Sequence, residues 1–462
     1  MVTGNYLPFN FHSFFFLNVF FYGGAFMVRL FGFFICAFPF LVASLSCDST
    51  EPPPIVPPPS PDLRKITLSV EDVSCIEVWL NIKADSISFP SEIILLKDTV
   101  AQTISLCCSD TTLYIDSLLP NKTYAYKAIL AADTTIKSET VTAQTLDTTS
   151  HNFSWQSWEF GEHSSSVLYD VAIIDENNIW AVGEIYMNDS LGNPDPKYYN
   201  AAHWNGTVWE LKRILYDENI WSIKTIYAFN ENDIWFAAFV HYYNGEFIEL
   251  PIPDILMGWS INKIWGTSSN DLYVVGNGGN IAHYSGPSGG WQKIESGTDL
   301  NIYDIWGDVN PQTGEYEILC VASNIFFNEG NKLLKVLDNV VTEVNNDGLP
   351  WSLFTLWFKP GRTYYVGGDG MYNVKQLGES WTKDLTLPPY YKSSIRGQAL
   401  NDIVLCGVYG LLMHNNGVEW KNYQYTVFEP DKTFANIDIK GNVVSASGSF
   451  GSKAFLTIGV RK

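Results

Sequence analysis

The sequence carries little charge for its length, and most of what it carries is negative. Charged residues make up 17% of the 462 residues, and 49 Asp and Glu against 28 Lys and Arg leave a formal net charge of -21. A phosphate backbone is repelled by such a chain, and no stripe of Lys or Arg offsets the acidity. We therefore expect no nucleic-acid partner, and we attribute the acidity to solubility after export.

Metal and cofactor motifs are also missing. None of the seven cysteines shows CxxC spacing, and neither an HExxH motif nor a glycine-rich phosphate loop is present, so we expect no metal and no cofactor. In an oxidising compartment Cys75 has two candidate disulfide partners, Cys107 and Cys108, and the sequence leaves both open. Cys320 and Cys406 stand in apolar strands, where we expect core thiols.

Aromatic residues are abundant by contrast, at 15% of the chain, with 16 Trp and 25 Tyr. Together with a hydrophobic fraction of 46%, this composition is typical of a folded β-rich protein. The length favours two or three domains over one compact core.

The N-terminal region is almost continuously apolar from residue 7 to residue 46. A transmembrane helix is one interpretation. In the other, the basic start at Arg29 and the apolar run after it lead to Ser44-Leu45-Ser46-Cys47. Residues 27–46 resemble a bacterial lipoprotein signal, which implies a lipid on Cys47. Ser44 departs from the Leu usual at that position, and an uncleaved or conventionally cleaved leader is the alternative.

The segments on either side of this signal have distinct compositions. Residues 1–26 are rich in Phe and Asn and lack Lys and Arg, so we interpret them as translated upstream sequence and Met27 as the start. Residues 47–61 include seven prolines in the last ten positions, which favours a stiff polyproline spacer of about 3.1 Å per residue. A lipid followed by such a spacer predicts a protein held on a bacterial membrane outside the cytoplasm, at the outer membrane or the cell surface.

Residues 62–148 show the alternation of about seven short strands, which predicts an immunoglobulin-like sandwich. The segment Leu118-Leu119-Pro120-Asn121-Lys122-Thr123-Tyr124 resembles the fibronectin type III signature. That resemblance implies a tyrosine corner at Tyr124 and the role of a spacer domain. Trp79 departs from the pattern, because it is out of phase with the apolar face of its strand.

Internal repeats of about 40 residues fill residues 152–462, and four short strands per repeat predict a β-propeller. The repeats are recognised by apolar strands at residues 167–171, 222–226, 261–265, 302–306, 353–357, 401–407 and 435–439. The last repeat stops after three strands, and residues 153–160 resemble its missing fourth. Pairing the two closes the ring and removes both free edges. Seven blades are expected, with six or eight as alternatives.

Several repeats end in a Gly-x-x-Trp motif, as in Gly206-Thr207-Val208-Trp209, Gly378-Glu379-Ser380-Trp381 and Gly417-Val418-Glu419-Trp420. These motifs resemble those of Asp-box propellers and of photosystem-assembly-factor propellers. The leading Ser-x-Asp of the Asp box is absent, so the resemblance implies the fold more than an activity.

The histidines and acids of the propeller follow the repeat. His203, His283 and His414 share one position, and His241 falls close to it. A catalytic residue need occur only once, so this recurrence predicts a structural role. Asp233, Asp271 and Asp402 recur in turns, where we expect them to cap the backbone.

A hydrolase would need more than the repeat supplies. A glycosidase needs two nearby carboxylates, and Asp170 with Asp304 is a pair that the sequence leaves open. Sialidases share the architecture and use three arginines, whereas the propeller arginines stand in unrelated contexts.

Binding has better candidates. Trp221, Trp259 and Trp351 each precede a Ser at the start of an innermost strand, near the mouth of the channel. Residues 184–200 form the longest insertion, and it carries Tyr186, Tyr198 and Tyr199. Such rings suit a protein or carbohydrate ligand. The alternative is that the three Trp pack between blades.

The sequence therefore predicts a non-enzymatic envelope lipoprotein in which a spacer domain presents a binding propeller. Its partners would be a protein or carbohydrate at the propeller face and a membrane through the lipid. A secreted hydrolase of the sialidase or glycosidase kind and an envelope assembly factor are the alternatives.

Overall fold

The computed structural model describes residues 62–325, 330–350 and 352–462. Cys47, the expected signal and linker, and Trp351 lie outside the described residues. Within the described part no helix combines the length and the apolarity needed to cross a membrane. This part is all-β, as predicted, and its helices are single turns: η1 (Asp254–Leu256), η2 (Asn277–Gly279) and α1 (Gly286–Gly289).

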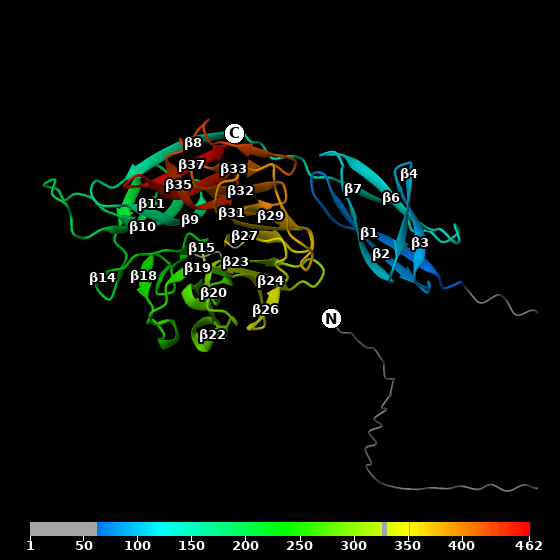
Figure 1. The fold of residues 1–462 in the computed structure, drawn as a ribbon, viewed down its shortest axis with the longest axis horizontal. Coiled ribbons are helices and arrows are strands. Elements are labelled where there is room, and N and C mark those ends of the chain that lie inside the picture. The colour runs from blue at the N-terminus through cyan, green and yellow to red at the C-terminus, as the bar shows by residue number, and fades with distance from the viewer. Residues whose placement is uncertain (1–61, 326–329, 351) are drawn as a thin grey trace, which may run out of the picture. The chain divides into compact units, whose positions relative to one another are not determined.

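A sandwich of two antiparallel sheets comes first (Figure 1, blue to cyan), with strand orders β1-β2-β5 and β4-β3-β6-β7. The strands are β1 (Lys65–Val73), β2 (Val78–Asp85), β3 (Ser91–Lys97), β4 (Val100–Leu106), β5 (Asp110–Ile115), β6 (Thr123–Leu130) and β7 (Val141–Gln144). Their alternation is the cause of the packing: in β6 every second residue, from Tyr124 to Leu130, is buried in the shared core.

Two residues of the sandwich explain features of its sequence. The Tyr124 hydroxyl oxygen accepts a hydrogen bond from the Leu119 backbone N–H at 2.9 Å, which is the contact of a tyrosine corner. Trp79 is out of phase with its strand because it faces away from the sandwich core. Its ring lies under the guanidinium of Arg362, 5.0 Å from Cζ to the ring centroid, and only 3% of the residue is exposed.

Seven four-stranded antiparallel sheets follow within the described residues, and in the first six the chain runs from each strand to its neighbour. The first three sheets contain β9 (Val167–Asp175), β10 (Asn178–Ile185), β11 (Tyr199–Trp204), β12 (Trp209–Lys212); β15 (Ile226–Asn230), β16 (Asp233–Phe236), β17 (Val240–Tyr243), β18 (Glu246–Glu249); and β19 (Ile261–Ser268), β20 (Asp271–Gly276), β21 (Asn280–Tyr284), β22 (Trp291–Glu295). A small hairpin of β13 (Leu215–Tyr216) and β14 (Asn219–Ile220) joins the first sheet to the second.

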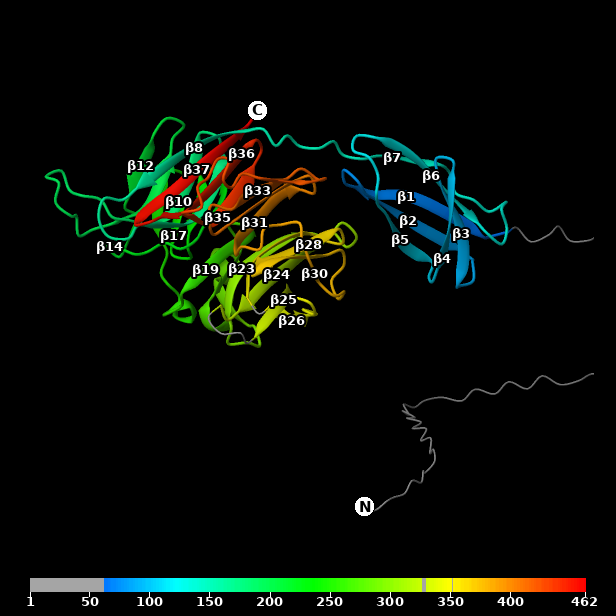
Figure 2. The same cartoon turned by 45° about the horizontal axis from the view of Figure 1, so that its top comes forward.

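The remaining sheets repeat the same plan (Figure 2, yellow to red, with β8 in blue-green). They contain β23 (Asn301–Val309), β24 (Tyr316–Ser323), β25 (Asn331–Leu337), β26 (Val340–Val344); β27 (Leu353–Lys359), β28 (Thr363–Gly368), β29 (Gly370–Val374), β30 (Thr382–Lys383); β31 (Lys392–Ala399), β32 (Asp402–Gly407), β33 (Leu412–Asn415), β34 (Trp420–Asn422); and β35 (Lys432–Lys440), β36 (Val443–Phe450), β37 (Lys453–Arg461) with β8 (Phe153–Phe160).

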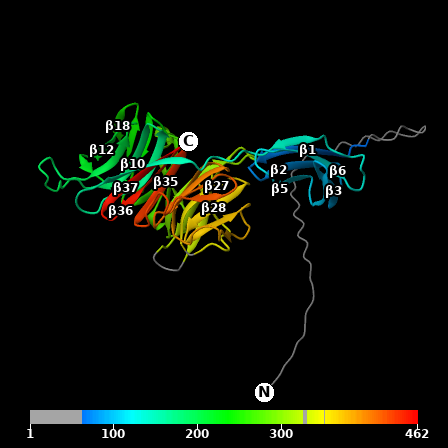
Figure 3. The same ribbon diagram turned by 90° about the horizontal axis from the view of Figure 1, so that it is seen from above.

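The sheets form a ring, the arrangement of a β-propeller, with the first strands of the sheets around its centre in Figure 1; Figure 3 shows the same sheets turned by 90°. The first strands of successive sheets contact one another in a closed cycle: β9, β15, β19, β23, β27, β31, β35 and again β9. The second strands are apolar runs because both of their faces are covered. In β32, for example, all six residues from Asp402 to Gly407 are buried.

The last sheet is completed by the strand that precedes the first one. β8 pairs with β37 along its whole length, from Phe153 opposite Arg461 to Phe160 opposite Ala454. Trp158 of β8 also packs with the core that the first and last sheets share. The two ends of the propeller segment therefore hold each other, and neither leaves a free edge at this seam.

Contacts with the sandwich lie at one face of the propeller. Arg362 binds Asp72 at 2.7 Å, Lys375 binds Glu77 at 2.5 Å, and the Asn401 amide donates to the Asp147 carbonyl at 2.9 Å. Each of these propeller residues lies where a first or third strand ends. We call this the lower face. The upper face is the opposite one, where the first strands begin and where second strands connect to third strands.

Candidate functional site

An apolar pocket of about 700 Å³ opens on the upper face between the second and third sheets. Trp221 and Trp259 line it together with Tyr216, Phe239, Ile252, Pro253, Leu256 and Met257. We call it the Trp221 pocket. Trp221 is 55% exposed and Met257 is 64% exposed, so large apolar side chains stand open to solvent here.

Local sequence explains how the Trp221 pocket forms. After β18 the chain carries Pro253 and the single turn η1, which buries Leu256 and turns Met257 outward. Trp259 follows and packs in part against the core of the third sheet. Trp221 and Trp259, which the sequence places at the same position of two repeats, therefore line one pocket. Trp221 is largely exposed and Trp259 is partly buried, so neither ring is wholly packed between blades.

Few polar groups line the Trp221 pocket. The Lys224 ammonium donates to the Ser260 hydroxyl at 3.1 Å. The Ser222 hydroxyl is buried without a hydrogen-bond partner among the described residues. Lys224 also borders the mouth of the channel, a cavity of about 430 Å³, so the two hollows adjoin. At that mouth Tyr303 and Phe354 stack with ring centroids 4.8 Å apart.

Below the mouth, buried ion pairs fill the channel. Asp170 accepts hydrogen bonds from the Thr225 hydroxyl at 3.0 Å, from the Ile226 backbone N–H at 3.1 Å and from the Lys263 ammonium at 2.9 Å. Both oxygens of this carboxylate are therefore engaged by groups of the channel itself.

Asp304 repeats the arrangement three sheets further on. It accepts from the Thr355 hydroxyl at 2.8 Å, from the Leu356 backbone N–H at 3.1 Å and from both terminal nitrogens of Arg396. The two carboxylates left open as a glycosidase pair thus each hold a threonine and a cation. Their matching environments are those of repeated structural residues.

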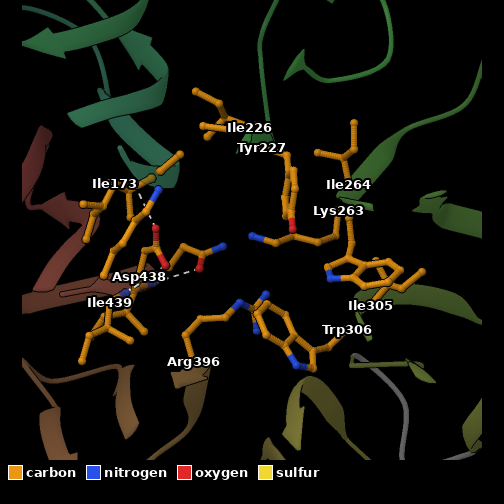
Figure 4. A pocket seen from close by; sticks show the side chains of 17 residues that line it. Ile173, Ile226, Tyr227, Lys263, Ile264, Ile305, Trp306, Arg396, Asp438 and Ile439 are labelled. Carbon is orange, nitrogen blue, oxygen red and sulfur yellow. Dashed lines mark hydrogen bonds between the residues drawn. The ribbon is translucent and has the colours of Figure 1, made fainter. Parts of the chain in front are cut away.

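A smaller cavity of about 170 Å³ lies beyond these ion pairs (Figure 4). Lys263, Arg396 and Asp438 reach toward it from different strands. Burial raises the pKa of Asp438, whose oxygens accept from the backbone N–H groups of Ile173 and Ile439 at 2.9 and 2.8 Å. Sequence reasoning singled out neither Lys263 nor Asp438.

The repeated histidines have the structural role that the sequence predicts. His241 stacks on Trp235 at 4.4 Å and bonds Asp233 at 2.8 Å, and the His283 ring nitrogen lies 2.6 Å from Asp271. The turn aspartates therefore bind the histidine of the third strand rather than capping the turn. In the first sheet Asn178 replaces Asp and bonds His203.

His414 also stands at the ring seam, where sequence reasoning saw no cluster. Its Nε2 lies 2.8 Å from Asp402, and its Nδ1 lies 2.7 Å from Nδ1 of His151. Arg461 binds the same Asp402. Burial, and then the neighbouring charge of His414, lower the pKa of His151 to about 4. The seam is therefore an internally bonded structure.

The tyrosines of the long insertion meet at the first sheet. Tyr186 donates to Glu184 at 3.1 Å, its ring lies 5.4 Å from that of Tyr198, and Tyr198 donates to the Ile220 carbonyl at 3.2 Å. Tyr199 instead lies under Arg213, 4.0 Å from Cζ to the ring centroid. Tyr198 thus connects the insertion to the residue before Trp221.

Sequence reasoning missed two members of this group, Tyr169 and Glu184. Tyr169, on β9, donates to Glu184 at 3.5 Å and also lines the channel mouth. Burial, and then the charge of Glu184, raise the pKa of Tyr169 to about 12, so its hydroxyl stays protonated near neutral pH. A visible signal was Glu184 itself, a charged residue in an otherwise apolar strand end.

The expected disulfide is not formed. Cys75, Cys107 and Cys108 are all free thiols. Cys75 is buried and turned toward the lower face, with its sulfur 3.6 Å from the Asn416 carbonyl oxygen. Cys107 and Cys108 lie exposed beside each other, so neither reaches Cys75. Cys320 and Cys406 are fully buried in the core, as predicted.

Comparison by sequence finds no matching protein-family model and no matching curated protein. Comparison by structure finds propellers. A structure of YCF48 bound to D1 peptide is 16% identical with a TM-score of 0.50, and the match covers 68% of this chain and 97% of that one. YCF48 from Cyanidioschyzon merolae is 13% identical with a TM-score of 0.46, over 66% and 98% of the two chains. The first likeness shows the propeller fold and extends to no residue of the site.

Proposed function

We propose that this chain is a non-enzymatic cell-envelope lipoprotein whose propeller binds a protein partner through its upper face. The observation that carries the proposal is the Trp221 pocket, because large apolar side chains left open to solvent mark interaction sites. A protein fits better than a glycan: the lining is mostly apolar, whereas a sugar also needs several converging polar groups.

The position of the Trp221 pocket also supports binding of a partner at the upper face. The sandwich contacts the lower face through Arg362 and Lys375, so the upper face lies away from it. We propose that the sandwich is a fibronectin type III spacer, supported by its strand orders and by the Tyr124 contact. With a lipid on Cys47 and the proline-rich linker, it would hold the seven sheets, taken as seven blades, off the membrane with the binding face outward.

A non-enzymatic role is supported by how the chemistry-bearing side chains are used. Asp170 and Asp304 hold Lys263 and Arg396, and the repeated histidines hold turn residues. Within the described residues no three His, Cys, Asp or Glu side chains converge on a possible metal position. YCF48, whose fold this chain shares, has been seen bound to D1 peptide, so a propeller of this kind is able to hold a peptide. We propose the same class of ligand here, in a binding or assembly role.

The test begins with capture of partners from envelope extracts on the purified full chain. The dissociation constant of each purified candidate is then measured for the wild type and for Trp221→Ala, Trp259→Ala and Leu337→Ala. Leu337 is a matched control, since it is 46% exposed but lies at the end of β25, outside the Trp221 pocket. We expect each tryptophan variant to weaken binding about tenfold or more and the control to leave it unchanged. Equal affinities for all variants would refute the proposal.

A further inference from the structure

Three tyrosine side chains lie around Glu184 at the upper face. Hydroxyls of Tyr186 and Tyr169 donate to its two carboxylate oxygens at 3.1 and 3.5 Å, and the ring of Tyr198 lies 5.4 Å from that of Tyr186. All four side chains are half-buried, so the group is partly shielded from water and partly accessible to it. We call these four residues the Glu184 cluster.

Two other carboxylates of the described chain accept a tyrosine hydroxyl, and the first of them is Glu317. Tyr364 donates to one of its oxygens at 2.7 Å, and the Lys335 ammonium binds the other at 2.8 Å. The negative charge is thus shared between a neutral donor and a cation, which is how a partly buried carboxylate is stabilised.

Glu77 follows the same rule. Tyr114 donates to it at 2.7 Å, the Lys375 ammonium binds it at 2.5 Å, and the same ammonium lies over the Tyr114 ring at 5.5 Å. The cation therefore meets both a carboxylate and an aromatic face. Only Glu184, among these three carboxylates, has the tyrosines without the cation.

No Lys, Arg or His of the described residues lies within ion-pair distance of Glu184, although the His163 ring packs 5.9 Å from that of Tyr186. None of their ion pairs involves Glu184. Arg213, which packs on Tyr199 of the same insertion, is already held by Asp195 at 2.5 Å. Of the three carboxylates, Glu184 is thus the one that has no ion-pair partner among the described residues.

We propose that the Glu184 cluster binds a basic side chain, lysine or arginine, of the partner protein. The carboxylate supplies the charge, and the faces of the rings of Tyr169, Tyr186 and Tyr198 supply cation–π attraction. The net charge of -21 draws a basic segment toward the surface. This inference rests on the proposed function for the source of the cation, whereas the site itself is testable without any partner.

The surroundings of the cluster suggest how one segment would occupy both sites. Tyr169 lines the channel mouth, which adjoins the Trp221 pocket at Lys224. On the other side, Tyr198 bonds the residue directly before Trp221. A short extended segment with a basic and an apolar side chain would thus place the first at Glu184 and the second in the Trp221 pocket.

The test uses small cations with the purified full chain in a non-ionic detergent. Saturation-transfer NMR titrations with n-butylammonium and n-butylguanidinium represent lysine and arginine, and n-butanol is the neutral counterpart. We expect at least one cation to bind and Glu184→Gln to weaken it about tenfold. Glu246→Gln, an exposed carboxylate on β18, is the matched control and should change nothing.

The outcomes separate this inference from the proposed function. Equal binding by Glu184→Gln and the control, no binding of either cation, or binding of butanol as strong as that of the cations would overturn it. If Glu184→Gln does not fold, Tyr186→Leu takes its place with the same expected weakening. Trp221→Ala should leave cation binding intact, so an intact cation site with no protein partner would count against the proposed function alone.

Discussion

Replacing Arg396 by methionine tests how the channel is held together. The guanidinium donates to both oxygens of Asp304, and side-chain exposures of 7% and 4% make this a buried pair. The substitution keeps the volume of the stem and removes the charge. It leaves the Asp304 carboxylate buried without a cation, although Thr355 and the neighbouring backbone still donate to it.

The magnitude follows from this geometry. Breaking a buried pair by removing one partner costs about 3–5 kcal/mol, and the remaining donors place the expected loss near the lower end, about 3 kcal/mol. The double variant Asp304→Asn with Arg396→Met removes both charges, so it should be more stable than the sum of the two single variants by about 1–3 kcal/mol.

The assay is urea unfolding followed by tryptophan fluorescence, with the midpoint and slope compared among variants. The control is Lys212→Met, which breaks an exposed pair with Glu210, where the side chains are 39% and 41% exposed. It should cost less than about 1 kcal/mol. A loss below about 1 kcal/mol for Arg396→Met, or strict additivity in the double variant, would refute the claim that the ion pair holds the channel.

Three further results are expected. The contribution of His151 to the free energy of unfolding is fully present above pH 6.5 and is lost as pH drops toward 4, because the folded pKa of His151 is about 4 against a reference of 6.5. Since His151 is only half-buried, we expect this contribution to be about 1–2 kcal/mol. If urea unfolding shows the same loss of stability in His151→Phe, that result would contradict the assignment. A thiol reagent such as DTNB should react faster with Cys108 than with Cys107, because the Thr111 hydroxyl lowers the pKa of Cys108; a fast phase that persists in Cys108→Ser would be inconsistent with that. Arg362→Ala should break the ion pair with Asp72 and so speed protease cleavage at residues 147–151, seen as separate fragments on a gel. Cleavage as slow as in the wild type would count against this expectation.

The propeller was predictable because each sheet has the same strand order and the same pattern of buried residues. A strand buried on both faces must be apolar, so runs such as 403–406 recur once per sheet and mark the fold in the sequence. The histidines recur for the same reason: each stacks on the second strand and bonds the turn before it, as His241 does with Trp235 and Asp233. Local periodicity carries this information without knowledge of distant contacts.

The site depended on contacts that have no local pattern. Lys263 reaches Asp170 across two sheets and 93 residues, so neither position signals the other. Glu184 meets Tyr169 only because β9 and β10 pair, and it is the absence of a cation that distinguishes it. The Cys75 prediction failed because cysteine spacing does not show which way a strand end faces.

The most direct test of the upper face as the binding face is photo-crosslinking in cells. A photoreactive amino acid replaces Met257 in the Trp221 pocket or, as the comparison, Leu337 at the end of β25. We predict one adduct of defined mass from position 257, absent from position 337 and lost when Trp221→Ala is added. No adduct at 257, or the same adducts from both positions, would contradict the account.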